Sequence, residues 1–290
     1  MQSARKITTI PLEIQKIQYL PPLPVIAQQL INELNSEDSS ITTIAAIIDR
    51  DPPLTSRIVG LANSAFFGCG SKLYSVQEAI VSLGLDLVRS LALTRVMGGV
   101  FDNNKCKGFD ISRYWLSAYM TAELTRDSAA ISGSSKHASN RQYFLYGLLH
   151  NLGVLVLTHA FPKLMGEIYS VVKGHQERRL VITEQAMLDI DHHQAGGWLA
   201  RKWHLPGEVI AVIEHHHFPD YAGTYREEVL LTGFCSRTAR NWIIGKETLI
   251  CEEPETLALL DINRTDMENT ATKCRARLED FRSIALEMCA

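Results

Sequence analysis

The feature that most limits how this chain can fold is a helical periodicity of apolar residues that runs from about residue 23 onward. In the segment VIAQQLINEL, for example, one stripe has the pattern of a half-buried helix, and its members are Val25, Ile26, Leu30 and Ile31. No segment shows the apolar–polar alternation of a β-strand, and no internal repeat or low-complexity tract is present. We therefore predict an all-α fold.

Cap and turn residues divide the chain between residues 22 and 101 into about five short helices. The prolines of PPLP precede the first helix, and Ser40 can cap the second, ITTIAAIIDR. Ser75 and Glu78, three positions apart, form the sequence pattern of a capping box at the start of a later helix. The apolar stripes predict a buried core with these members: Val25, Leu30, Ile44, Ile58, Leu61, Ile80, Leu83 and Leu87.

The polar stretch FDNNKCKGFD, residues 101–110, has no periodicity and predicts the boundary between two helical bundles. Longer helical patterns follow it. They cover residues 111–131, 141–160, 162–174, 181–203, 206–217 and 225–243, and less regularly 254–261 and 267–288.

Composition excludes some classes of function. The net charge is −3 and no run of Lys or Arg stands out, so we expect no nucleic-acid binding. The most apolar stretch, FLYGLLHNLGVLVLTHAF, contains two histidines and an asparagine, and is better explained as a buried core helix than as a membrane span. Six scattered cysteines without a C-x-x-C pair indicate reduced thiols. With no signal-peptide pattern at the N-terminus, we expect a cytoplasmic protein.

Histidine is the residue type most suggestive of chemistry, because six of the ten histidines fall between residues 192 and 217. Imidazole is a common ligand of transition metals, so one interpretation is a metal site built from His150, the pair at 192–193 and the run at 215–217. The other is that these are buried polar residues, hydrogen-bonded to backbone or to acidic neighbours. The spacing alone leaves both interpretations open.

Two other features favour structure over chemistry. Gly147, Gly153, Gly196 and Gly197 are expected to be close packing points between helices, because the chain has no G-x-x-x-x-G-K phosphate-binding motif. Ser117 is not expected to be a nucleophile, since no base and orienting group are recognisable around it.

An ordered set of motifs resembles the HDOD branch of the HD superfamily. LLHNLG is similar to the LLHDIG core of that superfamily, and LDIDHHQAGGWLARKWHLP followed by VIAVIEHHHFP is similar to the downstream HDOD pattern. LPPLPVIAQQLINEL, AAIIDRDPPLTSRIVGLANSAFFG and YSVQEAIVSLGLDLVRSLAL resemble its N-terminal motifs. The resemblance implies a five-helix N-terminal subdomain (residues 18–101) packed on an HD-like helical bundle (residues 111–245). Residues 246–290 would be a C-terminal helical extension.

The resemblance also implies positions for a metal site, several of which have lost their ligands. The first histidine of an active HD site falls at Leu116, the His-Asp pair at His150 and Asn151, and the distal aspartate at Phe234. The downstream histidines fall at His192, His216 and His217. We therefore expect no catalytic residue and no cofactor. The alternative is Fe, Mn or Zn held by His150, His192, His216 and His217, with Asp189, Asp191 or Glu214 as a conceivable oxygen ligand.

By resemblance, the expected function is a non-catalytic role in bacterial signal transduction. The chain would bind a signalling protein, or a small ligand or nucleotide, through a degenerate HD site. The alternative function is a metal-dependent phosphohydrolase that uses a reduced, histidine-rich site. Three incompatible ligand positions favour the first.

Overall fold

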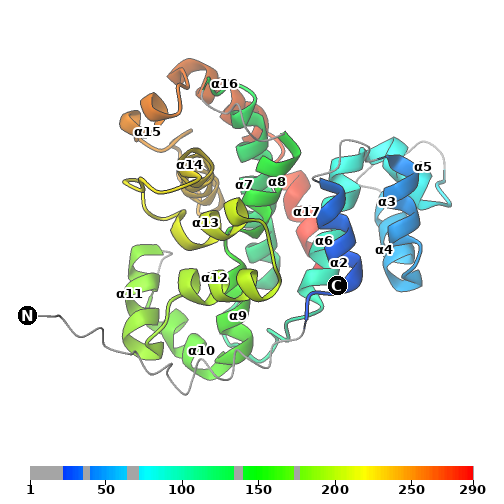
Figure 1. Cartoon of the computed structure of the whole chain (residues 1–290), viewed down its shortest axis with the longest axis horizontal. Helices are drawn as coiled ribbons and strands as arrows, with labels where there is room; N and C mark the ends of the chain where they lie inside the picture. The colour runs from blue at the N-terminus through cyan, green and yellow to red at the C-terminus, as the bar shows by residue number, and fades with distance from the viewer. Residues whose placement is uncertain (1–21, 35–39, 64–71, 134–139, 173–176, 290) are drawn as a thin grey trace, which may run out of the picture.

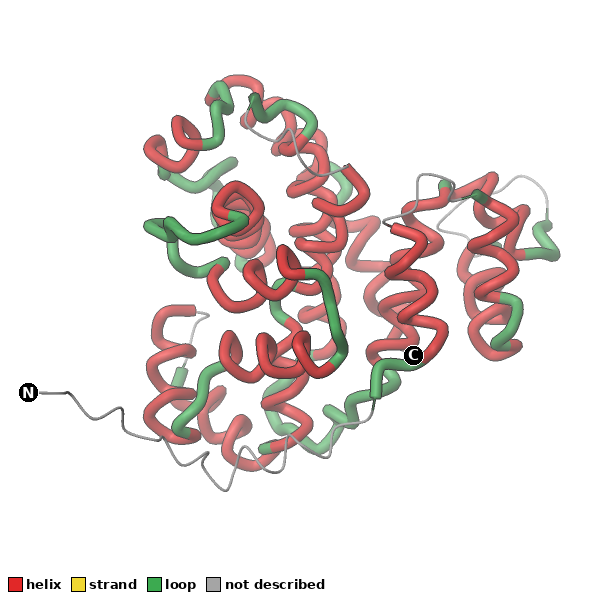
Figure 2. Tube along the Cα trace, viewed as in Figure 1, coloured by secondary structure: helices red, strands yellow, loops and turns green. Residues whose placement is uncertain are grey.

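The structure is a computed structural model that describes residues 22–34, 40–63, 72–133, 140–172 and 177–289. Every regular element in these residues is a helix, which confirms the predicted all-α class (Figures 1 and 2). The helices form a smaller N-terminal bundle and a larger C-terminal one, joined through residues 99–110, which are not helical. Residues 18–21 and 173–174 and Cys69, on which predictions were made, lie outside the described residues.

The N-terminal bundle contains the five helices that the cap residues predict. They are α2 (Val25–Leu34), α3 (Ile41–Ile48), α4 (Pro52–Ala62), α5 (Val76–Leu83) and α6 (Leu85–Gly98). Ser40 caps α3 by accepting a hydrogen bond from the Thr43 N–H at 3.1 Å. At α5, Ser75 Oγ accepts from the Glu78 N–H at 3.1 Å, and the Glu78 carboxylate accepts from the Tyr74 N–H at 2.6 Å. Local polar groups therefore set where these helices begin.

The core of this bundle matches the predicted stripes with one error. Five of the predicted residues are buried, and Leu83 and Leu87 are half-buried against the same core. Val25, however, is 72% exposed. Helix α2 turns Ala27, Leu30 and Ile31 inward, and at about 100° per residue Val25 then lies almost opposite the middle of that face. The predicted stripe therefore included a residue that faces away from the core.

This difference in burial makes a direct test of the core. Leu61→Ala should lower the free energy of unfolding by about 3 kcal/mol, because Leu61 is 4% exposed and its truncation leaves a cavity. Val25→Ala should change it by less than about 0.5 kcal/mol, since that side chain is already in solvent. Urea denaturation of both variants measures the contrast. Equal midpoints for the two would show that the bundle is packed differently.

The C-terminal bundle is built around α7 (Ile111–Ala129), which packs against α8, α14, α16 and α17 (Figure 1). Its other helices before residue 245 are α8 (Asn140–Leu149), α9 (Leu152–Ala160), α10 (Pro162–Val171), α11 (Glu177–Leu188), α12 (His192–Lys202), α13 (Gly207–His215) and α14 (Arg226–Ile243). The two bundles also contact each other through α6. The Tyr119 hydroxyl of α7 donates a hydrogen bond to Thr94 Oγ1 of α6 at 2.7 Å.

Two predicted helices are each broken in the structure, so those predictions were wrong in extent. The pattern 141–160 is interrupted at His150 and Asn151, between α8 and α9. The pattern 181–203 is interrupted at residues 189–191, where Asp189 adopts a left-handed φ of 57°. Asp191 then restarts the chain as α12 with a capping box closed by Gln194. Apolar periodicity continues across both breaks, which is why it does not reveal them.

The most apolar stretch of the chain is a core segment, as predicted. Residues Gln142–Ala160, which include most of α8 and α9, are long and apolar enough to cross a membrane by length and composition alone. However, 83% of their most apolar window is buried inside the protein. Side chains that neighbouring helices already cover are not available to lipid.

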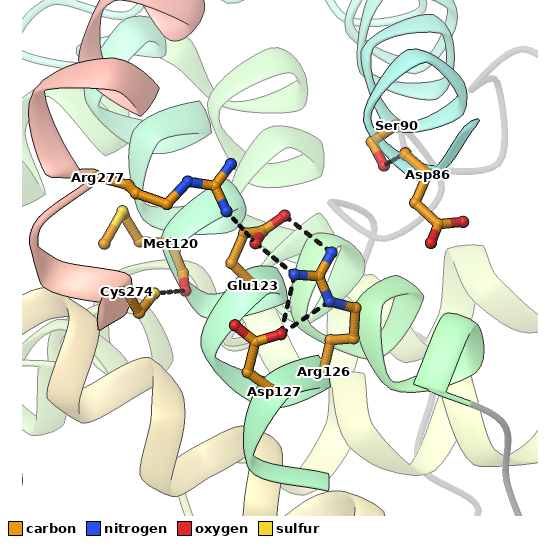
Figure 3. A network of polar contacts seen from close by, with 8 residues as sticks. All are labelled: Asp86, Ser90, Met120, Glu123, Arg126, Asp127, Cys274 and Arg277. Carbon is orange, nitrogen blue, oxygen red and sulfur yellow. Dashed lines mark hydrogen bonds and ion pairs between the residues drawn. The ribbon is translucent and has the colours of Figure 1, made fainter. Parts of the chain in front are cut away.

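The C-terminal extension consists of α15 (Pro254–Leu259), α16 (Arg264–Arg275) and α17 (Leu278–Cys289), with a break where one helix over 267–288 was predicted. Helix α17 packs against α7 and also touches α6, so it lies between the two bundles (Figure 1). The buried Glu123 carboxylate of α7 accepts hydrogen bonds from Arg126 at 2.7 Å and from Arg277 at 2.8 Å (Figure 3). The extension is therefore an integral part of the fold.

Candidate functional site

The two helix breaks and the end of α13 bring the histidine-bearing segments together. His150 follows the last residue of α8, and Asn151 is the N-terminal cap of α9. His192 and His193 are the first two residues of α12, directly after its cap. His216 and His217 follow the last residue of α13. Each of these histidines therefore lies at a helix end, where the chain changes direction, and their side chains meet in one region.

Four of these residues, His192, His193, His216 and His217, form what we call the histidine cluster. One ring nitrogen from each lies within 4.8 Å of the others. His193 Nε2 and His217 Nδ1 are 2.9 Å apart. His150 lies beside the cluster, with its ring centroid 4.9 Å from that of His216. His193, which the HD resemblance leaves out of the ligand set, is thus as central as the other three.

Hydrogen bonds at Nδ1 fix the ring orientation of three of the histidines. His150 Nδ1 lies 2.7 Å from the Gly147 carbonyl oxygen, and His216 Nδ1 lies 3.0 Å from that of Val212. His192 Nδ1 lies 2.6 Å from Glu184 Oε2. Because all three partners only accept, each Nδ1 carries the hydrogen and each Nε2 keeps its lone pair.

Two members of the cluster, His193 and His216, are neutral at ordinary pH. Burial, and secondly the neighbouring imidazoles, hold the pKa of His193 and of His216 well below the usual value. His216 Nε2 and His193 Nδ1 are buried, and neither makes a hydrogen bond to any described residue. Buried nitrogens without a partner are costly, so a site of this kind is expected to serve a ligand.

Glu184 of α11 is a buried carboxylate that the sequence did not single out. Its side chain has no exposed surface, and Oε2 accepts from both the backbone N–H and Nδ1 of His192, at 3.0 and 2.6 Å. Oε1 is buried and makes no hydrogen bond within the described parts of the chain. The available signal was its spacing of four from the apolar Leu188, which puts both on the inward face of α11.

His150 and Asn151, which the resemblance aligns with the His-Asp pair of the HD pattern, form a hydrogen-bonded pair. Asn151 Nδ2 lies 2.8 Å from His150 Nε2, and the Ser236 hydroxyl lies 3.0 Å from the same nitrogen. Since His150 Nδ1 donates to Gly147, Nε2 is the acceptor of both. The nitrogen of His150 that could bind a metal is therefore engaged by two protein donors.

Leu116 and Phe234 are core residues in the structure. Leu116 is 4% exposed on α7, and Phe234 is fully buried on α14. Other residues of these helices reach the site: Ser117 is one of the α7 residues that line the adjacent pocket, and Ser236 of α14 bonds His150. A helix turns by about 100° per residue, so a shift of one or two positions selects a different face.

The three acidic residues considered as oxygen ligands are not part of the cluster. Both Glu214 oxygens accept from Arg201, at 2.6 Å each. Asp191 Oδ1 caps α12 by accepting from the Gln194 N–H at 2.9 Å, and lies 3.7 Å from His193 Nδ1. Asp189 is exposed in the left-handed turn. Glu214 and Asp191 are thus engaged by groups outside the cluster, and Asp189 faces solvent.

A pocket of about 260 Å³ opens beside the cluster. Asn151, His192 and His217 lie on its wall, together with Tyr114, Tyr169 and the two arginines Arg113 and Arg240. Burial raises the pKa of both tyrosine hydroxyls well above the usual value, so they remain neutral hydrogen-bonding groups. Apolar walls with a few polar and cationic groups are typical of small-ligand sites.

The donor atoms decide which metals the site fits. An ion that prefers oxygen ligands, such as Mg²⁺ or Mn²⁺, does not fit, because the cluster offers imidazole nitrogen and the neighbouring Asn151 is an amide that bonds His150. A borderline ion such as Zn²⁺ does fit, since it accepts imidazole. The histidine cluster would hold it, with Glu184 behind His192.

The profile of the HDOD domain family matches residues 20–219. An "uncharacterized protein" of Treponema pallidum (strain Nichols) is 28% identical over 239 residues, which is 78% of this chain and 43% of that protein. The chain thus spans less than half the length of this relative.

Solved structures share the architecture. A candidate signal transduction protein of Marinobacter aquaeolei VT8 superimposes with a TM-score of 0.81 at 24% identity, over 94% of this chain and 60% of that one. A candidate phosphohydrolase of Shewanella amazonensis SB2B gives 0.71 at 23% identity, over 95% and 97%. An HDOD domain protein of unknown function from Geobacter sulfurreducens gives 0.72 at 19%, over 95% and 98%. At these identities the likeness concerns the fold.

Proposed function

Because this chain belongs to the HDOD domain family, we propose that it is a non-catalytic regulatory protein of bacterial signal transduction. It acts by binding a signalling protein, or a small ligand or nucleotide, and does not hydrolyse phosphodiesters. The similarity in fold to the Marinobacter signal transduction protein is compatible with this role. The proposed location is the cytoplasm, and the cysteines whose side chains are described, Cys106, Cys235, Cys251 and Cys274, are all free thiols.

The observation that carries the proposal is the hydrogen bond from Asn151 to His150 Nε2, 2.8 Å long. Metal-dependent hydrolysis needs an ion that polarises the phosphoryl oxygen and lowers the pKa of a bound water. In the HD pattern the aspartate offsets the charge of that ion. An amide contributes only a dipole, and here its N–H group occupies the lone pair that the histidine would give to the metal.

The pocket beside the cluster is the proposed site for a small ligand. Its arginines would attract an anionic group, and its tyrosines could stack on a ring or donate hydrogen bonds. A ligand there would touch residues of α7, α10, α12 and α14 at once. Binding could therefore alter how these helices pack, which is how a regulatory module can pass on a signal.

The test is hydrolysis by the full chain. A generic phosphodiester and a set of nucleotides, assayed with added Mn²⁺ or Fe²⁺, should give no turnover above that of buffer with metal. The matched comparison is His150→Ala, which removes the histidine of the HD pair. Turnover by the wild-type chain that disappears in this variant would overturn the non-catalytic proposal and support the phosphohydrolase alternative.

A further inference from the structure

We propose that the histidine cluster binds one borderline divalent ion, best represented by Zn²⁺, through His192, His193, His216 and His217, and that His150 is not a ligand. This inference deepens the proposed function, because a site closed by four protein ligands leaves no position for a reacting water. It names a class of metal and a ligand set. This ligand set differs from the HD pattern because it includes His193 and excludes His150.

The first argument is the geometry of the donor atoms. One nitrogen from each histidine lies within 4.8 Å of the other three. In a tetrahedral site with Zn–N bonds of 2.0–2.1 Å, two ligand nitrogens are about 3.3 Å apart. His193 Nε2 and His217 Nδ1, now 2.9 Å apart, are already close to that spacing. Small side-chain movements would bring the remaining nitrogens to it.

The second argument is that two rings of the cluster, those of His192 and His216, make the outer hydrogen bonds that are usual for metal-binding histidines. A histidine that binds metal through one nitrogen commonly donates the other N–H to a carboxylate or a backbone carbonyl. His192 does so to Glu184 at 2.6 Å, and His216 does so to Val212 at 3.0 Å. The Nε2 lone pair of His216 is buried and meets no donor in the described residues.

The third argument is electrostatic. Glu184 is completely buried, and no lysine or arginine in the described parts of the chain pairs with it. Its hydrogen-bond partners in the described residues are the backbone N–H and the ring Nδ1 of His192. An isolated buried carboxylate is strongly unfavourable. A divalent ion in the adjacent cluster would supply the missing positive charge through the His192 ring.

His150 is excluded from the ligand set by its own contacts. Its Nδ1 donates to Gly147 and its Nε2 accepts from Asn151 and Ser236, so both ring nitrogens are occupied. A site of the HD type would require these bonds to break. His193 has no such commitment, since its Nε2 faces His217 within the cluster and its Nδ1 makes no hydrogen bond to a described residue.

The experiment is equilibrium dialysis of the chelator-treated full chain against Zn²⁺, with a chromophoric chelator as competitor. The wild-type chain should bind one Zn²⁺. His193→Ala should weaken binding by more than the roughly 10–100-fold that loss of an outer-shell partner costs, and Glu184→Gln by about that amount. His215→Ala is the matched control, because it lies in the same run but stacks on Tyr221 at 4.5 Å and should bind normally.

Co²⁺ gives a second readout that does not depend on affinity. Four-coordinate Co²⁺ absorbs visible light far more strongly than six-coordinate Co²⁺, so the wild-type chain and His150→Ala should both show the intense spectrum. Circular dichroism identifies variants that fail to fold, and His193→Gln then replaces His193→Ala. Absence of stoichiometric Zn²⁺, or binding that depends on His150 and not on His193, would overturn the inference.

The hydrolysis assay separates this inference from the proposed function. Zn²⁺ binding by the cluster without turnover supports both. No Zn²⁺ binding and no turnover overturns the metal site and leaves the non-catalytic role in place. Turnover that requires His150 overturns the non-catalytic role whatever the dialysis shows.

Discussion

Gly153→Ala is expected to lower the free energy of unfolding by at least about 4 kcal/mol, since it forces two helices apart. A Cβ atom at residue 153 of α9 would lie 1.7 Å from the carbonyl oxygen of His192 and 2.8 Å from the amide nitrogen of Gly196. Both are backbone atoms of α12, so neither can rotate away. The same movement would displace His192, so the variant should also lose Zn²⁺ binding if it folds.

Gly60→Ala is the matched control for this substitution. Gly60 also lies within a helix, α4, but a Cβ there would meet no atom within 4 Å. Replacing an exposed helical glycine by alanine should stabilise the chain by up to about 1 kcal/mol. Urea denaturation with similar m-values for both variants measures the difference. A Gly153→Ala midpoint close to that of Gly60→Ala would show that α9 and α12 do not approach each other in this way.

The second large effect is a loss of stability as the pH falls. The pKa values of His193 and His216 are well below the ordinary value of about 6.5 in the folded chain, mainly because both are buried. Below about pH 6.5 the unfolded chain therefore binds two protons that the folded chain does not. Each contributes a loss of about 1.4 kcal/mol per pH unit, so metal-free protein should lose about 4 kcal/mol between pH 7 and pH 5 from this pair.

Paired variants isolate this contribution from that of the carboxylates. The double variant His193→Gln, His216→Gln should show a much flatter dependence over the same range. The double variant His204→Gln, His215→Gln, which removes two histidines from outside the cluster, is the control for the loss of two imidazole groups. Denaturant unfolding at a series of pH values provides the data. Equal slopes in the wild-type chain and the first variant would mean that the buried pair takes up protons in the folded state.

The helical class and the N-terminal bundle could be predicted because their causes are local. The capping groups Ser40, Ser75 and Glu78 stand within four residues of the N–H groups they satisfy. Apolar spacing also predicted five buried residues of this bundle correctly. Val25 shows the limit of this information, because the spacing of apolar residues does not say which of them face the neighbouring helix.

The meeting of four histidines was predicted as well. The family pattern pointed to His150, His192, His216 and His217, which the structure places side by side. It did not point to His193 or Glu184. The places of these two side chains depend on a break in the helical pattern at residues 189–191. Because of that break, the first residues of α12 meet the end of α13 and the inner face of α11. Apolar residues continue through that break, so periodicity carries no trace of it.

The sequence by itself determined that the chain is helical, that Ser40 and Ser75 cap helices of the N-terminal bundle, and that histidines gather near one region. Tertiary structure alone decided which ring nitrogens face one another, that Asn151 and Ser236 occupy His150, and that α17 lies between the two bundles. The physical reason is range. Helix formation and capping are governed by groups a few residues apart, whereas a ring nitrogen finds its partner only when helices distant in sequence have packed against each other.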